Sequence, residues 1–292
     1  MGFEFRRPLG LFLSGGGALG SWQAGFLSRL VKAGLEFDRI LGFSAGALSG
    51  AGYCLRRMDE LEERWKNSDR NNILRFGPRF QPPTLFSDAG VWAAVVNAGD
   101  QAAARAAARC ELFVVSYRVE EQTRVYSRFS PQGARGWDGP LDARLVASCA
   151  IPMIFPPQRI SEGEKTFTYV DGGVRGREPM RCDQLEGCKD VIAVEMIRAE
   201  EIGRRRWNPL AQRDQHGREV LRAHMDSGID SLRRLPDPPR VFRAAPSRVL
   251  DFSMLAFKSK TCAPALDLGV RDGESFLRAP GRFGLNGAFS PA

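Results

Sequence analysis

Residues 39–50, with the sequence RILGFSAGALSG, decide the fold that we expect for this chain. A short apolar run leads to Ser44, which has a glycine two positions away on each side, and small residues suited to a helix follow. This is the strand–turn–helix pattern G-x-S-x-G, the nucleophile elbow, in which a serine hydroxyl stands clear of a sheet. Gly42 and Gly46 keep such a turn free of clashing β-carbons. We therefore predict that Ser44 is a nucleophile, with the N-terminus of the next helix favouring negative charge beside it.

The segment before the elbow also has an apolar run that ends in glycines. Residues 8–13 predict a buried strand, residues 14–20 a glycine-rich turn and residues 21–33 a helix. With residues 39–43 as the next strand, these elements form a right-handed βαβ unit whose two strands are parallel. The sequence therefore predicts an α/β fold with a mainly parallel sheet.

Downstream segments add to the predicted sheet. Residues 111–119 and 123–128 alternate between apolar and polar side chains, as in an antiparallel hairpin. Residues 167–170 predict a strand that runs directly into Asp171-Gly172-Gly173. The other predicted elements are helices over residues 45–56, 60–67, 88–109 (with a break near Gly99), 141–149 and 219–235, a buried strand over residues 191–196, and two short helices in the tail, residues 249–277.

Three predicted strand ends carry groups that suit acyl chemistry. The glycine loop 15–17, Ser44 and Asp171 each follow or close a strand, and reactive groups in open α/β sheets gather at the carboxyl ends of parallel strands. We expect the three to converge. The backbone N–H groups of the loop, which are those of Gly15, Gly16, Gly17 and Ala18, are then candidates for an oxyanion hole, where one donor is typically worth about 3–4 kcal/mol.

The identity of the base is the discriminating question. A conventional hydrolase follows its serine and acid with a histidine, but this chain has only His216 and His224. His224 lies on an amphipathic helix, where a core-edge or surface position is common, and His216 lies in a polar stretch with no strand end to position it. A Ser44–Asp171 dyad fits better, provided that burial raises the pKa of the carboxyl group from about 4 toward neutrality. Gly172-Gly173 permits a sharp turn beside it.

Composition limits the class of protein. The chain has 292 residues, 43% of them hydrophobic, and no repeat or linker divides it, so we expect one domain over residues 1–292. Its six cysteines form no C-x-x-C pair, and the chain has only two histidines. This composition favours reduced thiols in the cytoplasm over a disulfide framework or a metal site. The N-terminus has no convincing signal-peptide cleavage site. No apolar stretch approaches the ~20 residues of a membrane span.

The net charge of +8 comes almost wholly from arginine. It indicates either an ordinary solvated basic surface or attraction of the protein to the anionic surface of a membrane. No helix-turn-helix, finger or aromatic–basic pattern accompanies the charge, so a nucleic-acid partner is not expected.

Two segments interrupt the regular pattern. Residues 71–87 contain three prolines and read as a loop with exposed-looking Phe76, Phe80 and Phe86. Such a loop either packs on the core or serves as a lid that contacts lipid, because long structured loops are often functional. Residues 198–218 are polar and arginine-rich with no clear period, which predicts a surface insertion.

These motifs together resemble those of the bacterial patatin-like phospholipases. The family's glycine-rich motif matches residues 15–20, its nucleophile motif residues 42–46 and its D-G-[AG] motif residues 171–173. Residues 147–157, which include ASCAIP and FPP, resemble the segment that precedes the family's aspartate, and residues 250–272 resemble its C-terminal region. The resemblance covers most of the chain but is weak over residues 55–140 and 198–248.

The resemblance implies a three-layer α/β/α fold and a serine acyl hydrolase: a phospholipase A, lysophospholipase or lipid esterase. Ser44 would be the nucleophile, Asp171 the general base and glycines 15–17 the oxyanion hole, with lipid or lysophospholipid esters as substrates and neither cofactor nor metal. One departure is Leu19, where the family usually has Arg or Lys. The glycines that complete the matching motifs are Gly20, Gly42, Gly46, Gly172 and Gly173.

Two other functions compete with this one. Gly15-x-Gly17-x-x-Gly20 also satisfies the dinucleotide-binding fingerprint, with Glu36 or Asp38 near the right distance for a ribose contact. That hypothesis leaves the elbow and Asp171 unexplained. A non-catalytic lipid-binding or scaffolding protein on the same fold is the other alternative, and Leu19 and the arginine-rich segment are the features that favour it.

Overall fold

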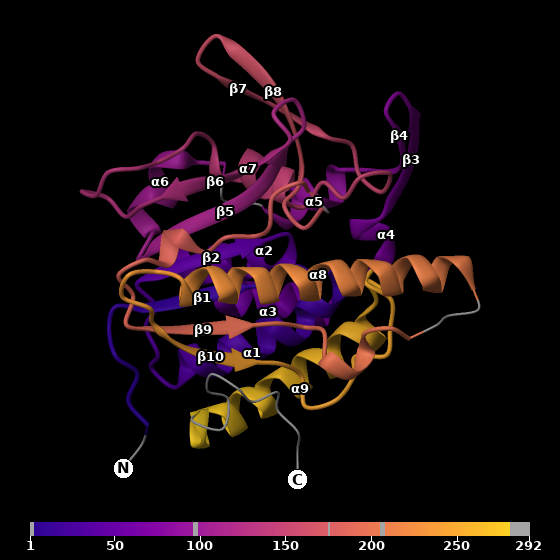
Figure 1. Ribbon diagram of the computed structural model, residues 1–292. Coiled ribbons are helices and arrows are strands. Elements are labelled where there is room, and N and C mark those ends of the chain that lie inside the picture. The colour runs from indigo at the N-terminus through magenta and orange to yellow at the C-terminus, as the bar shows by residue number, and fades with distance from the viewer. Residues whose placement is uncertain (1–2, 96–98, 175, 205–207, 281–292) are drawn as a thin grey trace.

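The computed structural model describes residues 3–95, 99–174, 176–204 and 208–280 (Figure 1). In this part of the chain an eight-stranded sheet has the order β10-β9-β1-β2-β5-β8-β7, with β6 paired to β5. A separate two-stranded sheet pairs β3 with β4. The strands are β1 (Leu9–Leu13), β2 (Arg39–Phe43), β3 (Arg75–Phe80), β4 (Pro83–Ser87), β5 (Glu111–Arg118), β6 (Thr123–Phe129), β7 (Gln158–Glu162), β8 (Lys165–Asp171), β9 (Asp190–Val194) and β10 (Arg240–Ala244).

The helices follow the predicted pattern in the first third of the chain and differ later. The predicted helix over residues 219–235 begins ten residues earlier, and the tail forms one long helix instead of two short ones. The helical segments are η1 (Gly17–Leu19), α1 (Gly20–Lys32), α2 (Ala45–Cys54), α3 (Met58–Lys66), α4 (Arg70–Ile73), α5 (Ala89–Ala94), α6 (Gln101–Ala107), α7 (Leu141–Ser148), η2 (Asp183–Leu185), η3 (Ala199–Glu201), α8 (Pro209–Arg233) and α9 (Ser259–Arg278). The predicted helix over residues 88–109 corresponds to α5 and α6. Gly99, near which a break was predicted, lies between these two helices, and residues 96–98 lie outside the described residues.

Helices cover both faces of the parallel part of the sheet. In Figure 1, α8 crosses in front of the strands, and α1, α2 and α3 lie behind them. Side chains alternate accordingly: a β-carbon at Gly228 of α8 would meet the ring of Phe12, whereas one at Gly50 of α2 would meet the neighbouring Leu13. The long helix α9 packs along α1. This is the predicted α/β fold in three layers, with a largely parallel central sheet.

The parallel strands explain the continuous apolar runs of the sequence. β10, β9, β1, β2 and β5 are parallel neighbours, and every residue of β1 and β9 is buried. A strand covered on both faces has no solvated side, so its residues need not alternate. The predicted β1–α1–β2 unit is confirmed, and strands from both ends of the chain share this sheet.

The second half of the sheet is antiparallel. β6 and β8 both run opposite to β5, and β7 runs opposite to β8. The predicted strand before Asp171 therefore exists, but it is not one of the parallel strands from which we expected the site to be built. β7 and β10 were not predicted from the sequence.

The expected loop over residues 71–87 is instead a short helix followed by the β3–β4 hairpin. The hairpin stands apart from the main sheet at the upper right of Figure 1. Its prolines lie in or beside the strands rather than in an irregular loop, which a two-stranded ribbon tolerates because each strand has an unpaired edge.

Four side chains of the predicted surface insertion over residues 198–218 do not lie at the surface. Arg198, Glu201, Gln215 and Arg218 are all buried. Their charges and polar groups pair with one another and with backbone carbonyl groups, which is what permits polar side chains to leave water. Residues 205–207 lie outside the described part of the chain.

None of the helices that the described residues form combines the length and the apolar character needed to cross a bilayer.

Candidate active site

Ser44 holds the strained backbone that the elbow motif predicts. Its φ is 54° and its ψ −128°, a conformation that L-residues rarely adopt. The flanking glycines make the turn possible: a β-carbon at Gly42 would lie 2.6 Å from the carbonyl oxygen of Gly46, and one at Gly46 would lie 2.4 Å from that of Leu13. The turn places Ser44 directly before α2, at the carboxyl end of β2.

A buried serine fixes the backbone of Ser44 from the side. The N–H of Ser44 donates to Oγ of Ser148 at 2.9 Å, and that hydroxyl donates to the carbonyl oxygen of Val115 at 2.6 Å. Ser148 is fully buried at the end of α7. Sequence analysis missed this residue, although it lies in the segment 147–157 that resembles the family.

Asp171 reaches Ser44 because two strands meet end to end along β5. Phe43, the last residue of β2, pairs with Val115, and Asp171, the last residue of β8, pairs with Ser116. Since β2 runs parallel to β5 and β8 runs antiparallel to it, their carboxyl ends converge. A β-carbon at Gly172 would lie 2.4 Å from the carbonyl oxygen of Val115, so the turn after Asp171 needs glycine there.

Burial tunes the carboxyl group of Asp171. Loss of water raises its pKa to about 6, while the Ser44 hydroxyl and the Gly173 N–H favour the carboxylate and limit the rise. Oδ1 accepts the Gly173 N–H at 2.7 Å. Oδ2 is buried and has no hydrogen-bond partner among the described residues. A buried carboxylate with a raised pKa beside a serine hydroxyl is suited to receive a proton.

The glycine loop lies against Ser44. A β-carbon at Gly15 would come within 2.9 Å of Cβ of Ser44, so only glycine permits this approach. Gly17 has a φ of 55°, and a β-carbon there would lie 2.3 Å from the Met254 carbonyl oxygen. For the N–H groups of Gly15, Gly16 and Gly17, no hydrogen bond is found within the described residues.

Ala18 does not fit its predicted role. Its N–H donates to the carbonyl oxygen of Met254 at 2.8 Å and is therefore already engaged. Leu19 donates in turn to the carbonyl oxygen of Gly16 at 3.1 Å, which closes η1. The predicted hole is thus reduced to the three glycines, because the chain after α8 occupies the fourth donor.

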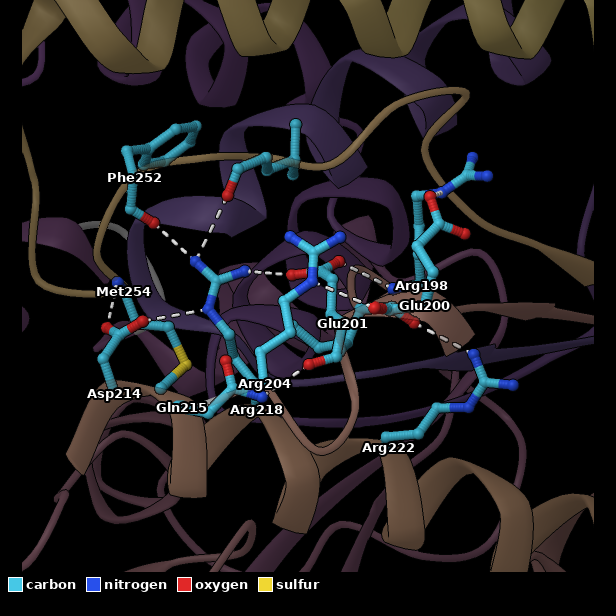
Figure 2. A network of polar contacts seen from close by, with 12 residues as sticks. Arg198, Glu200, Glu201, Arg204, Asp214, Gln215, Arg218, Arg222, Phe252 and Met254 are labelled. Atoms are coloured by element: carbon cyan, nitrogen blue, oxygen red, sulfur yellow. Dashed lines mark hydrogen bonds and ion pairs between the residues drawn. The ribbon is translucent and has the colours of Figure 1, made fainter. Parts of the chain in front are cut away.

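A polar network on α8 holds the segment that carries Met254 (Figure 2). Asp214 accepts the Met254 N–H and the Ser253 hydroxyl, each at 2.8 Å. Arg218 pairs with Asp214 at 2.9 Å and with Glu201 at 2.6 Å, and it also donates to the carbonyl oxygen of Phe252 at 2.6 Å. Apart from the Asp214–Arg218 pair, which has i,i+4 spacing on α8, these contacts join residues far apart in the sequence, so sequence analysis could not find them.

The two histidines occupy different environments, and neither has a hydrogen bond to Ser44 or Asp171 among the described residues. His216 is exposed on α8. His224 is buried beside Phe43, and its Nε2 lies 3.1 Å from the carbonyl oxygens of both Gly173 and Val174. Burial and the neighbouring Arg124 lower the pKa of His224 to about 4. His224 is therefore neutral near pH 7 and donates to the loop that follows Asp171.

A largely apolar cavity opens beside Ser44. Ser44 and Gly17 form part of its wall, and α2, α3, α5 and α7 supply most of the rest. Among the described residues that line it, the charged ones are Arg57, Glu60 and Arg64, which form two ion pairs. The apolar lining residues are Ala45, Leu48, Ala51, Leu55, Leu61, Trp65, Ile73, Val91, Ala94, Val95, Leu145, Ile151, Phe155 and Phe257.

The structure argues against the dinucleotide alternative. Both proposed ribose contacts, Glu36 and Asp38, precede β2, at the opposite end of that strand from Ser44. Asp38 pairs with Arg7 at 2.7 Å and accepts the Leu9 N–H at 2.7 Å.

Across the described residues no group of three or more His, Cys, Asp and Glu side chains is arranged to hold a metal ion.

A family model described as "Patatin-like phospholipase" matches residues 11–181, which is more than half of the chain. The chain belongs to the patatin-like phospholipase family. The matched range contains Ser44, Asp171 and the glycine loop, and the resemblance that the motifs indicated is confirmed. Leu19, where the patatin-like phospholipases usually have Arg or Lys, is fully buried in this member.

Two solved structures resemble the chain at low identity. VipD from Legionella pneumophila is 15% identical with a TM-score of 0.47, and the match covers 93% of this chain and 67% of that one. Human GIVD cytosolic phospholipase A2 is 11% identical with a TM-score of 0.47, and the match covers 94% of this chain and 62% of that one.

Proposed function

We propose that this patatin-like protein is a serine acyl hydrolase that acts on lipid or lysophospholipid esters through a Ser44–Asp171 dyad. The observation that carries the proposal is the placement of Ser44 in a strained elbow beside a buried aspartate with one unpartnered oxygen. Structural aspartates are usually paired or solvated, whereas this one keeps an oxygen free and a pKa of about 6.

The chemistry follows from the positions of these groups. Asp171 accepts the proton of the Ser44 hydroxyl as its oxygen attacks the ester carbonyl carbon. The carbonyl oxygen becomes an oxyanion, which the N–H groups of Gly15, Gly16 and Gly17 stabilise. As the alcohol departs, it takes the proton from Asp171, which leaves an acyl group on Ser44. Water, deprotonated by Asp171, then attacks the acyl carbonyl carbon. The bond to Ser44 breaks, the serine oxygen takes the proton back from Asp171, and the fatty acid is released.

The cavity supports a lipid as the substrate. An acyl chain that enters it exchanges water for the aliphatic and aromatic side chains of its wall, which favours binding by about 0.8 kcal/mol for each buried methylene group. The ester at the end of the chain then lies beside Ser44, which forms part of the same wall.

Two measurements on the full chain test this function. Incubation with mixed lipids should release free fatty acid with wild type and not with Ser44→Ala. A fluorophosphonate probe should label the wild type at Ser44. Folded wild-type protein that releases no fatty acid and takes up no probe would favour the alternative, a non-catalytic lipid-binding protein.

A further inference from the structure

The β3–β4 hairpin presents large apolar side chains to solvent. The exposed fractions are 90% for Phe80, 78% for Phe76 and 52% for Leu85. Such side chains add nothing to the core, and their exposure costs free energy unless something covers them. The hairpin is anchored at its base but its tip stands away from the main sheet (Figure 1).

The same hairpin carries positive charge without acidic partners. The hairpin, residues 75–87, contains Arg75 and Arg79 and no aspartate or glutamate. Both arginines are exposed, and no ion pair is found for them in the described residues. Other arginines of the fold, such as Arg218 and Arg243, pair with carboxylates.

The base of the hairpin is built into the rim of the apolar cavity. Ile73, two residues before β3, lines the cavity, as does Val91 after β4. β4 also donates two backbone hydrogen bonds to the segment between Ile151 and Phe155, both of which line the cavity: Leu85 N–H to the Met153 oxygen at 3.1 Å and Phe86 N–H to the Ile154 oxygen at 3.0 Å.

Met153 extends this surface toward α8. Its side chain is 52% exposed, and Nη2 of Arg213 lies 3.4 Å from its sulfur. Leu210, one turn before Arg213, is 78% exposed. Apolar and cationic side chains thus alternate from the hairpin to the first turns of α8.

We propose that the β3–β4 hairpin docks the protein on anionic lipid bilayers, with Phe76 and Phe80 inserted among the acyl chains and Arg75 and Arg79 on the headgroups. Aromatic side chains flanked by arginines match the apolar interior and phosphate surface of a bilayer. A second copy of the chain would bring two sets of unpaired arginines together, and their repulsion opposes it. The docking itself does not depend on the proposed hydrolysis. If the protein is a lipid hydrolase, docking by the hairpin would also bring the apolar cavity close to its substrate in the membrane.

Vesicle flotation tests the proposal in the Ser44→Ala background, where lipid is not consumed. We expect this protein to float with vesicles of phosphatidylcholine and phosphatidylserine and not with phosphatidylcholine alone. Phe76→Ser/Phe80→Ser should abolish flotation. Arg75→Gln/Arg79→Gln should weaken binding about tenfold or more, and raised salt should have the same effect. A matched control, Val119→Ser/Arg234→Gln, also removes an exposed apolar side chain and an exposed arginine, but elsewhere, and should bind normally.

The outcomes separate the occupants. Equal binding by the hairpin variants and the parent overturns the proposal. Equal binding to vesicles with and without phosphatidylserine overturns it as well. Concentration-dependent dimers that the Phe76→Ser/Phe80→Ser change abolishes, without vesicle binding, assign the surface to a second copy and overturn it as well. Hydrolysis of a short soluble ester by wild type reports separately on the proposed function, so failure of one is distinguishable from failure of the other.

Discussion

The carbonyl oxygen of Met254 accepts a hydrogen bond from the N–H of Ala18 at 2.8 Å. This contact joins the chain after β10 to the glycine loop that follows β1. Asp214 and Arg218 hold the Met254 segment through the network in Figure 2. The orientation of the loop N–H groups therefore depends on residues that lie outside the range matched by the family model.

Asp214→Ala should lower the rate of ester hydrolysis, because Met254 loses the acceptor of its N–H and the glycine loop loses its fixed position. We expect kcat to fall about tenfold or more, with a smaller change in KM, since the role proposed for the loop is to stabilise the oxyanion of the transition state. Asp214→Asn keeps one acceptor oxygen and should recover part of kcat. Arg278→Gln, which breaks an exposed ion pair, is the control. A fall in kcat no larger than the loss of folded protein would reduce Asp214 to a structural role.

The rate should depend on the ionisation of Asp171. The base works as the carboxylate, and its pKa is raised to about 6, so kcat/KM should rise with pH through about 6 and be lost below it. The measurement is a pH profile with a short soluble ester. A profile that is flat between pH 5 and pH 7 (the range set by about one unit on either side of that pKa) would contradict the assignment of Asp171 as base.

The difference between what could and could not be predicted has a physical origin. The apolar runs of β1 and β2 and the glycines around Ser44 are local signals, and the structure confirms the elements they predict. The Asp171-Gly172-Gly173 motif predicts the aspartate, but the expectation that it would follow a parallel strand is wrong. Its strand is antiparallel, and it meets β2 end to end through the pairing register along β5, which local sequence does not encode.

Long-range charge pairing explains why the buried residues of the segment 198–218 could not be predicted. Glu201 and Arg218 are seventeen positions apart and form a buried ion pair at 2.6 Å, yet each by itself resembles a surface residue. The hairpin over residues 75–87 could not be predicted for another reason. Both of its faces are largely exposed, so its sequence lacks the alternation that a half-buried strand requires.

Ser148→Ala should destabilise the protein and impair the elbow. It leaves the buried N–H of Ser44 and the Val115 carbonyl oxygen without their partner, which should lower the free energy of unfolding by about 1–3 kcal/mol. Ser49→Ala is a matched control, because its hydroxyl is buried in α2 and has no partner within the described residues. Chemical denaturation measures both. Equal effects of the two changes would show that the Ser148 hydrogen bonds contribute nothing.

The histidines should be dispensable for proton transfer. His216→Ala should leave hydrolysis unchanged, because the side chain is exposed and away from the site. His224→Ala removes the donor to the Gly173 and Val174 oxygens, so some loss of stability is expected, but the rise of kcat/KM through about pH 6 should persist. Loss of that pH dependence in folded His224→Ala would indicate that His224 takes part in proton transfer, as in a Ser–His–Asp triad.

The most direct test of a histidine-free dyad compares kcat for ester hydrolysis in Asp171→Asn, Ser44→Ala and His224→Ala, each confirmed to be folded. Asp171→Asn preserves the size of the side chain and removes only its ability to accept a proton. We predict that its kcat falls at least about a hundredfold, close to the level of Ser44→Ala, while His224→Ala retains most of its activity. An active Asp171→Asn, or a His224→Ala as inactive as Ser44→Ala, would contradict the account.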